Sequence, residues 1–166
     1  MTATNELPPA DAFVPAEPQV ALTDGIVVTG SRDIGRTAAR TAFALHLTGW
    51  CGHQRTWLVG GAIGIDRWVL EWLAERDETV WVVVPFTAAR QPASVQTALR
   101  LAQRVIELQL PEGKTAYIRR NYYMVEHAAT VLGFWSGKRG GTLATLTYAQ
   151  RRGRETHWQA LPGGTP

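Results

Sequence analysis

Residues 56–73, TWLVGGAIGIDRWVLEWL, indicate the fold class most clearly. The stretch opens with a short apolar run over residues 56–59, which is typical of a buried strand. Three glycines follow at its end and predict a tight turn. Apolar residues then recur at i, i+3, i+4, i+7 and i+8, the spacing of one helix face, at Ile65, Trp68, Val69, Trp72 and Leu73. A buried strand, a glycine turn and an amphipathic helix are the repeating unit of a parallel α/β sheet.

The same alternation continues along the chain in both directions. Strands are predicted at residues 25–29, 56–59, 79–84, 105–108, 130–135 and 156–160. Helices are predicted over about 35–48, from 65 onward, over about 92–103 and 115–128, and over 142–151. This order predicts a single Rossmann-like α/β domain at residues 23–161, with a parallel sheet covered by helices on both faces.

Composition agrees with one globular domain. The chain has 166 residues, of which 45% are hydrophobic and 19% charged, as in ordinary soluble proteins. Residues 1–22, rich in Pro and Ala, and residues 162–166 are predicted to be disordered tails. No stretch has the length of a membrane span and no secretory signal is recognisable. With Cys51 as its one cysteine, the chain is expected to be cytoplasmic.

Positive charge is concentrated in the last third of the chain. Residues 114–154 hold eight lysines and arginines against one acid, Glu126. Such a segment indicates an anionic partner, but a solvated face that carries arginines gives the same pattern. Composition leaves both interpretations open.

Ligands of parallel α/β sheets bind outside the carboxyl ends of the strands, so the loops at those ends are the candidate site. The first loop carries Gly30, Ser31 and Arg32. The glycine lets backbone amides approach an anion, the serine offers a hydroxyl, and the guanidinium has a fork of donors that matches phosphate. The start of the following helix adds unpaired amides and the positive end of its dipole.

Two further loops have the same character. The second contains Gly60, Gly61 and Gly64, and we expect these glycines to be pressed against a ligand. Asp66 follows in the first helical turn, where it caps the helix or contacts the ligand. The third loop carries Gly140, Gly141 and Thr142 beside two cationic side chains. Three glycine loops at one sheet edge predict a phosphate-binding site.

Other chemistries are not indicated. The third loop lacks the Walker A spacing, so no nucleoside triphosphatase is predicted. The four histidines are scattered and no metal-ligand spacing is present, so we expect neither a metal nor a cofactor.

Four motifs in sequence order, spanning roughly residues 25–160, resemble the SLOG superfamily. They are Gly30-Ser31-Arg32, the segment 60–66, Arg120-Asn121-Tyr122-Tyr123-Met124, and the segment 140–145. This superfamily includes DprA-like DNA-processing proteins, nucleotide-sensing domains and LOG phosphoribohydrolases. The resemblance implies a Rossmann-like fold, phosphate bound by the first and last loops, and Arg120 and Asn121 facing the ligand.

LOG enzymes carry a catalytic glutamate after their glycine motif. Here Leu143, Ala144 and Thr145 follow Gly141-Thr142, and neither Asp66 nor Glu126, the acids near the motifs, takes that place. Cleavage of an N-glycosidic bond requires such a carboxylate. The sequence therefore favours a protein without catalytic activity.

Three functions remain, in this order of preference. The first is a non-catalytic sensor or carrier of a nucleotide. The second is a DprA-like protein that binds single-stranded DNA, for which the overall charge is weak. The third is a LOG-like nucleoside 5′-monophosphate phosphoribohydrolase, which the missing glutamate disfavours. No membrane partner is expected, and a homodimer is compatible with each function.

Overall fold

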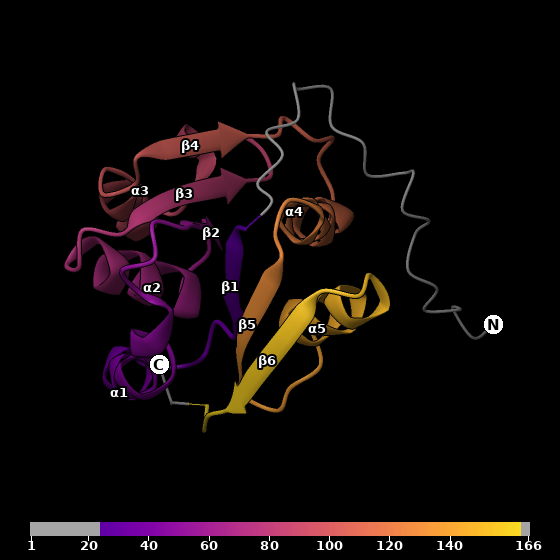
Figure 1. The fold of residues 1–166 in the computed structure, drawn as a ribbon. Coiled ribbons are helices and arrows are strands. Elements are labelled where there is room, and N and C mark those ends of the chain that lie inside the picture. Colours follow the sequence, from indigo (N-terminus) through magenta and orange to yellow (C-terminus); the bar gives the residue numbers. More distant parts are fainter. Residues whose placement is uncertain (1–23, 164–166) are drawn as a thin grey trace.

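Six strands form one sheet in which every neighbouring pair is parallel (Figure 1). The computed structural model describes residues 24–163. The strands are β1 (Ile26–Gly30), β2 (Thr56–Gly60), β3 (Thr79–Val84), β4 (Arg104–Glu107), β5 (Thr130–Trp135) and β6 (Glu155–Ala160). Their spatial order is β4-β3-β2-β1-β5-β6.

Helices cover both faces of this sheet. They are α1 (Arg36–His46), α2 (Ile65–Ala74), α3 (Ala93–Leu99), α4 (Thr115–Glu126) and α5 (Gly141–Arg151), with 3₁₀ turns η2 (Thr48–Trp50) and η3 (Ala88–Arg90). The first three pack on one face, and α4 and α5 pack on the other (Figure 1). The predicted Rossmann-like α/β class, a parallel sheet between two helical layers, is confirmed.

The central strand shows why the apolar runs are continuous. Ile26 and Val28 of β1 belong to the core beneath α1–α3, whereas Val27 between them belongs to the core beneath α4 and α5. All three side chains are fully buried. A strand with a helix layer on each face must be apolar at every position, which is the pattern the sequence has.

Three helices end earlier than predicted, and the one predicted over 115–128 stops at Glu126. The predicted helix 35–48 stops at His46, and the chain tightens into η2 because Trp50 N–H bonds to Leu47 O at 2.9 Å. The predicted helix 92–103 is only Ala93–Leu99. Gln103 is used elsewhere, since its side-chain oxygen accepts the Val80 N–H at 2.6 Å and its amide donates to a carbonyl. The two Gln103 contacts are tertiary, so local propensity could not reveal them.

The predicted tails fall almost wholly outside the described residues. All of 1–22 lies outside, as do 164–166. Pro162 and Gly163 are described, and Gly163 packs so closely on Asp33 and Ser136 that a side chain there would meet both. Within residues 24–163, no helix is both long and apolar enough to cross a bilayer.

The chain reverses its direction of growth beside β1. It builds outward from β1 to β4, then crosses back through α4 to place β5 on the other side of β1. In such sheets the carboxyl edge at the reversal opens a crevice, because the flanking helices diverge there. The site described next lies at this edge.

Candidate functional site

A pocket of about 500 Å³ lies at the carboxyl edge of β1 and β5. Its walls come from the β1–α1 loop, the start of α2, the first turns of α4 and the β5–α5 loop. Nine of the twelve predicted site residues line it: Gly30, Ser31, Arg32, Asp66, Arg120, Asn121, Gly140, Gly141 and Thr142. The topology thus brings together motifs more than one hundred residues apart.

The other three predicted residues, Gly60, Gly61 and Gly64, do not line this pocket. A side chain on Gly60 would collide with the Asp66 carboxylate and the Arg120 guanidinium. One on Gly61 would lie 2.8 Å from Val84, and Gly64, at φ +76°, lies against the backbone of the first loop. Gly60 thus makes room for two groups of the pocket floor, Gly61 for the Val84 side chain and Gly64 for the first loop, and the contact of these glycines with a ligand stays a prediction.

The first and third loops are tied to each other. Ser31 Oγ accepts the Ser136 N–H at 3.0 Å, and the Ser31 N–H donates to Phe134 O at 3.0 Å. The Ser31 hydroxyl oxygen therefore accepts a hydrogen bond that holds the β5–α5 loop in place. Its hydrogen is a donor that a ligand can use.

The N-terminus of α5 opens onto the pocket. Gly140 is its N-cap and no side-chain hydrogen bond caps it. The first intrahelical bond in this turn joins Ala144 N–H to Gly140 O. The amides of the preceding residues, which include Gly141 and Thr142, have no partner further back in the helix and lie at the positive end of its dipole.

The pocket floor holds a buried carboxyl group, that of Asp66, and a buried guanidinium group, that of Arg120. Asp66 is 7% exposed and Arg120 is 3% exposed. Burial raises the pKa of Asp66, and the charge of Arg120 and the Ala62 N–H offset part of that rise. Burial likewise lowers the pKa of Arg120, and Asp66 opposes this change. The two side chains share the space that the missing side chain of Gly60 leaves.

Arg120 and Asn121 also connect α4 to the start of α5. Arg120 donates through Nη1 to Val83 O at 3.1 Å and through Nε to Asn121 Oδ1 at 2.7 Å. Asn121 Nδ2 donates to Thr145 Oγ1 at 2.9 Å, and that hydroxyl donates to Gly141 O at 2.6 Å. This chain of hydrogen bonds fixes the orientation of the glycine turn, so both residues line the pocket and hold its wall.

The predicted site residues do not include every lining residue, and three of those missing are Asp33, Lys114 and Tyr117. Asp33 directly follows the first motif, and Lys138 Nζ lies 2.7 Å from its Oδ2. This ion pair bridges the first and third loops and holds the pKa of Asp33 below its usual range. Lys114 and Tyr117 lie at the start of α4, and the Arg32 guanidinium is 5.4 Å from the Tyr117 ring centroid. Their spacing of three places both on one helix face, a signal the charge count alone did not expose.

The prediction that Asp66 and Glu126 are the acids near the motifs is wrong for Glu126 and leaves out Asp33. Asp33 lines the pocket, whereas Glu126 lies at the far end of α4. There Glu126 accepts hydrogen bonds from Arg152 at 2.6 and 3.0 Å and from the Tyr148 hydroxyl. Arg154 donates to Val125 O at 3.1 Å beside them.

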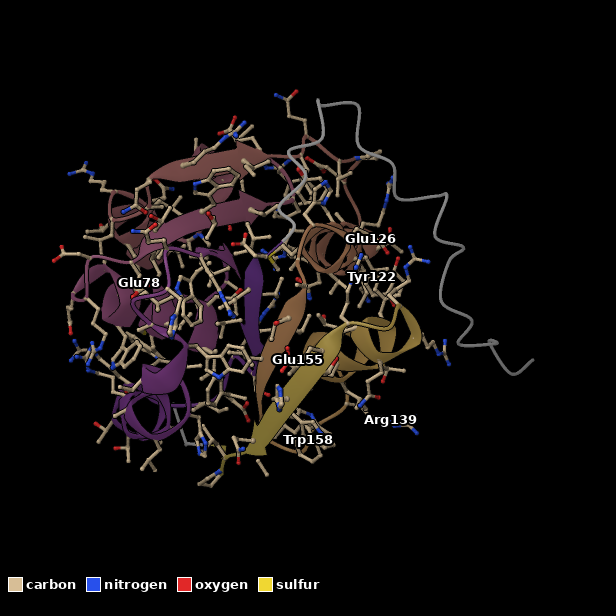
Figure 2. All side chains as sticks on the ribbon, in the orientation of Figure 1. Glu78, Tyr122, Glu126, Arg139, Glu155 and Trp158 are labelled. Carbon is tan, nitrogen blue, oxygen red and sulfur yellow. The ribbon has the colours of Figure 1, made fainter. Side chains whose placement is uncertain are left out.

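Six of the eight cations in the basic segment 114–154 therefore fall into two groups. Lys114, Arg120, Lys138 and Arg139 line the pocket, and Arg152 and Arg154 clamp the end of α4. Figure 2 places Glu126 and Arg139 at separate ends of the α4–α5 layer. The structural interpretation therefore holds for the last two arginines, and an anionic partner stays a prediction for the pocket group. Residues 24–163 contain no group of three or more acids, histidines or cysteines placed to hold a metal ion.

No protein-family model and no curated protein sequence matches this chain. Solved structures do match. The DNA processing protein A (DprA) of Streptococcus pneumoniae superposes with a TM-score of 0.69 at 17% identity, covering 81% of this chain. The chain spans 50% of that protein's length.

Two further structures are similar. The DprA of Helicobacter pylori, described for its single-stranded DNA binding mode, has a TM-score of 0.68 at 16% identity, covering 96% of this chain and 81% of its own. A protein named TM1055 has a TM-score of 0.54 at 19% identity, covering 80% and 72%. The chain thus has the Rossmann-like fold found in DprA proteins, as its resemblance to the SLOG superfamily implied.

Proposed function

We propose that this protein binds a nucleotide and seats its phosphate between the β1–α1 loop and the N-terminus of α5. The observation that carries the proposal is the uncapped start of α5 inside a pocket with an excess of positive charge. Five cationic side chains line the pocket against two acidic ones: Arg32, Lys114, Arg120, Lys138 and Arg139 against Asp33 and Asp66. Helix amides and guanidinium groups are the donors that phosphate prefers.

The rest of the pocket suits the other parts of a nucleotide. Tyr117 is 42% exposed on the α4 side, where a base can stack on its ring and on the neighbouring Arg32. Asn121 and Asp66 supply polar groups on the floor. The pocket volume of about 500 Å³ lies in the range that small-molecule sites occupy. We infer a binding protein, since no acid follows Gly141-Thr142.

A DprA-like function in binding single-stranded DNA is the second candidate. It is favoured by the exposed cations Lys114 and Arg139 at the pocket rim. A backbone phosphate outside the pocket would find a cation there. It is also favoured by the fold shared with the Helicobacter pylori protein, whose structure concerns single-stranded DNA binding. In both candidates the same loops hold one phosphate.

The variant Gly141→Asp tests the phosphate seat. A side chain at this position meets only Asn121 Nδ2, at 3.6 Å, so the change is tolerated sterically. An acid in the first helical turn favours folding through the helix dipole. The same carboxylate would repel a bound phosphate. We expect nucleotide affinity to fall at least about tenfold, while the melting temperature is unchanged or higher.

Gly35→Asp is the matched control. Gly35 is the N-cap of α1, has nothing within 4 Å of a Cβ atom and does not line the pocket. Aspartate at this N-cap should also stabilise its helix, here by capping, and the variant should keep full affinity. Both measurements use isothermal titration calorimetry with a nucleoside monophosphate and thermal unfolding. Equal affinity in the two variants would refute the proposed phosphate position.

A further inference from the structure

One tryptophan is set apart from the others. The chain has seven, and all lie in the described range. Trp57 and Trp72 are buried and four are half-buried, whereas Trp158 on the edge strand β6 is 47% exposed. An indole ring contributes stability mainly through burial, so an exposed one on a rigid strand is a candidate contact surface.

Trp158 is joined to the pocket through the β5–α5 loop. Its ring packs edge-to-face on Trp135, with centroids 5.7 Å apart. The Trp135 indole N–H donates in turn to Lys138 O at 2.7 Å. Lys138 and its exposed neighbour Arg139 line the pocket. Figure 2 shows Trp158 and Arg139 at the same end of the domain. A path of contacts therefore leads from the phosphate seat past a cation to an exposed ring.

We propose that Trp158, supported by Trp135, is a second base-stacking subsite for a ligand of two or more linked nucleotides whose first unit occupies the pocket. The proposal rests on the proposed function, because the first unit must occupy the pocket. Arg139, exposed and next to Lys138 in the loop that Trp135 contacts, would meet the phosphate that joins the units. Aromatic rings beside cations hold single strands in this way, because every base has a face that can stack.

The size of the exposed surface favours a base over a protein partner. The other large apolar side chains exposed in residues 24–163 lie on different elements: Leu45, Ile63, Leu101 and Tyr117. None is on β6, and the ring packed against Trp158 is the half-buried Trp135. A stable protein interface needs about 800 Å² on each partner. A single base needs only one ring face.

The division of the basic segment agrees with this picture. Arg152 and Arg154 are engaged at the far end of α4 and do not extend the cationic surface toward β6. Gain in affinity with ligand length should therefore come from stacking more than from charge. Affinity for a short oligonucleotide should depend shallowly on salt, with a slope of about −0.7 for each of the few phosphates contacted.

Titration calorimetry on the full chain, with dTMP and (dT)4 as ligands, tests the proposal. The variants are Trp158→Ala, Trp158→Phe and, as a control with an exposed apolar side chain on α1, Leu45→Ala. We expect Trp158→Ala to leave dTMP affinity unchanged and to weaken (dT)4 at least about fivefold. Trp158→Phe should recover most of the loss, and Leu45→Ala should match the wild type.

The outcomes separate the two proposals. If wild-type protein binds neither dTMP nor (dT)4, the proposed function itself fails. If dTMP binds but (dT)4 binds Trp158→Ala as tightly as wild type, only the stacking subsite is refuted. An edge strand can also pair with a second copy of the chain. Sedimentation velocity on the same samples tests whether the protein forms such a dimer. A wild-type dimer that Trp158→Ala dissociates, with (dT)4 affinity retained, would overturn the subsite in favour of a homodimer contact.

Discussion

Replacement of Arg32 by alanine should separate binding from stability. The side chain is exposed and lines the pocket, and its guanidinium lies 5.4 Å from the Tyr117 ring centroid. Charge-assisted hydrogen bonds to a phosphate contribute about 1–3 kcal/mol, so nucleotide affinity should fall about 5- to 150-fold. The folded state loses only an exposed cation–π contact, about 0.5–1 kcal/mol. The melting temperature should therefore fall by less than about 4 °C.

The assay combines titration calorimetry with a nucleoside monophosphate and thermal unfolding by circular dichroism. Arg36→Ala is the matched control, because Arg36 is also exposed, begins α1 and does not line the pocket. It contacts Glu71 at 3.6 Å, a surface ion pair of small energy. Arg36→Ala should leave affinity unchanged. Unchanged affinity in Arg32→Ala together with a large loss of stability would refute the reasoning and give Arg32 a structural role.

Three further predictions concern the floor, the far end of α4 and catalysis. Gly60→Ala should destabilise the fold by about 1–3 kcal/mol in urea unfolding, because its methyl group meets the Asp66 carboxylate and the Arg120 guanidinium; an unchanged midpoint would show that the floor is not tightly packed. Burial opposes ionisation of Glu126, but hydrogen bonds from Arg152 and Tyr148 outweigh it and lower its pKa. This contribution to stability is present above about pH 4.5 and is lost as the pH falls through the lowered pKa. The unfolding free energy of Glu126→Gln should therefore depend less on pH in that range. Identical pH dependence in the variant and the wild type would contradict this role of Glu126. Incubation with AMP should release no adenine above background by liquid chromatography, and release that Asp66→Asn or Asp33→Asn abolishes would instead reveal a hydrolase.

The fold could be predicted because each strand and helix has its own local signal. The runs at 79–84 and 130–135 were located to the residue, since strands buried on both faces are apolar throughout. Helix ends were less accurate where a tertiary contact decides them. Gln103, for example, binds the backbone of β3 instead of extending α3.

The candidate site was predictable only in part. Motifs at the ends of parallel strands meet at one edge, so Gly30–Arg32 and Gly140–Thr142 could be placed together from sequence. What Gly60 makes room for could not be predicted, because one of its neighbours, Arg120, comes from a helix far along the chain. Asp33 directly follows the first motif and could have been included from sequence. Tyr117 and Trp158 were missed because they come from other segments. Their position at the pocket or beside its loop depends on the packing of segments far apart in the chain.

A comparison of a nucleotide with its nucleoside tests the central claim most directly. Titration of the wild-type protein with dTMP and with thymidine, at one ionic strength, isolates the contribution of the phosphate. Hydrogen bonds from charged groups and helix amides to the phosphate are each worth about 1.5–3 kcal/mol. If the start of α5 holds the phosphate, dTMP binds at least about tenfold more tightly than thymidine, and Gly141→Asp removes this difference. Equal affinity for the two ligands in the wild-type protein would contradict a phosphate site at the start of α5.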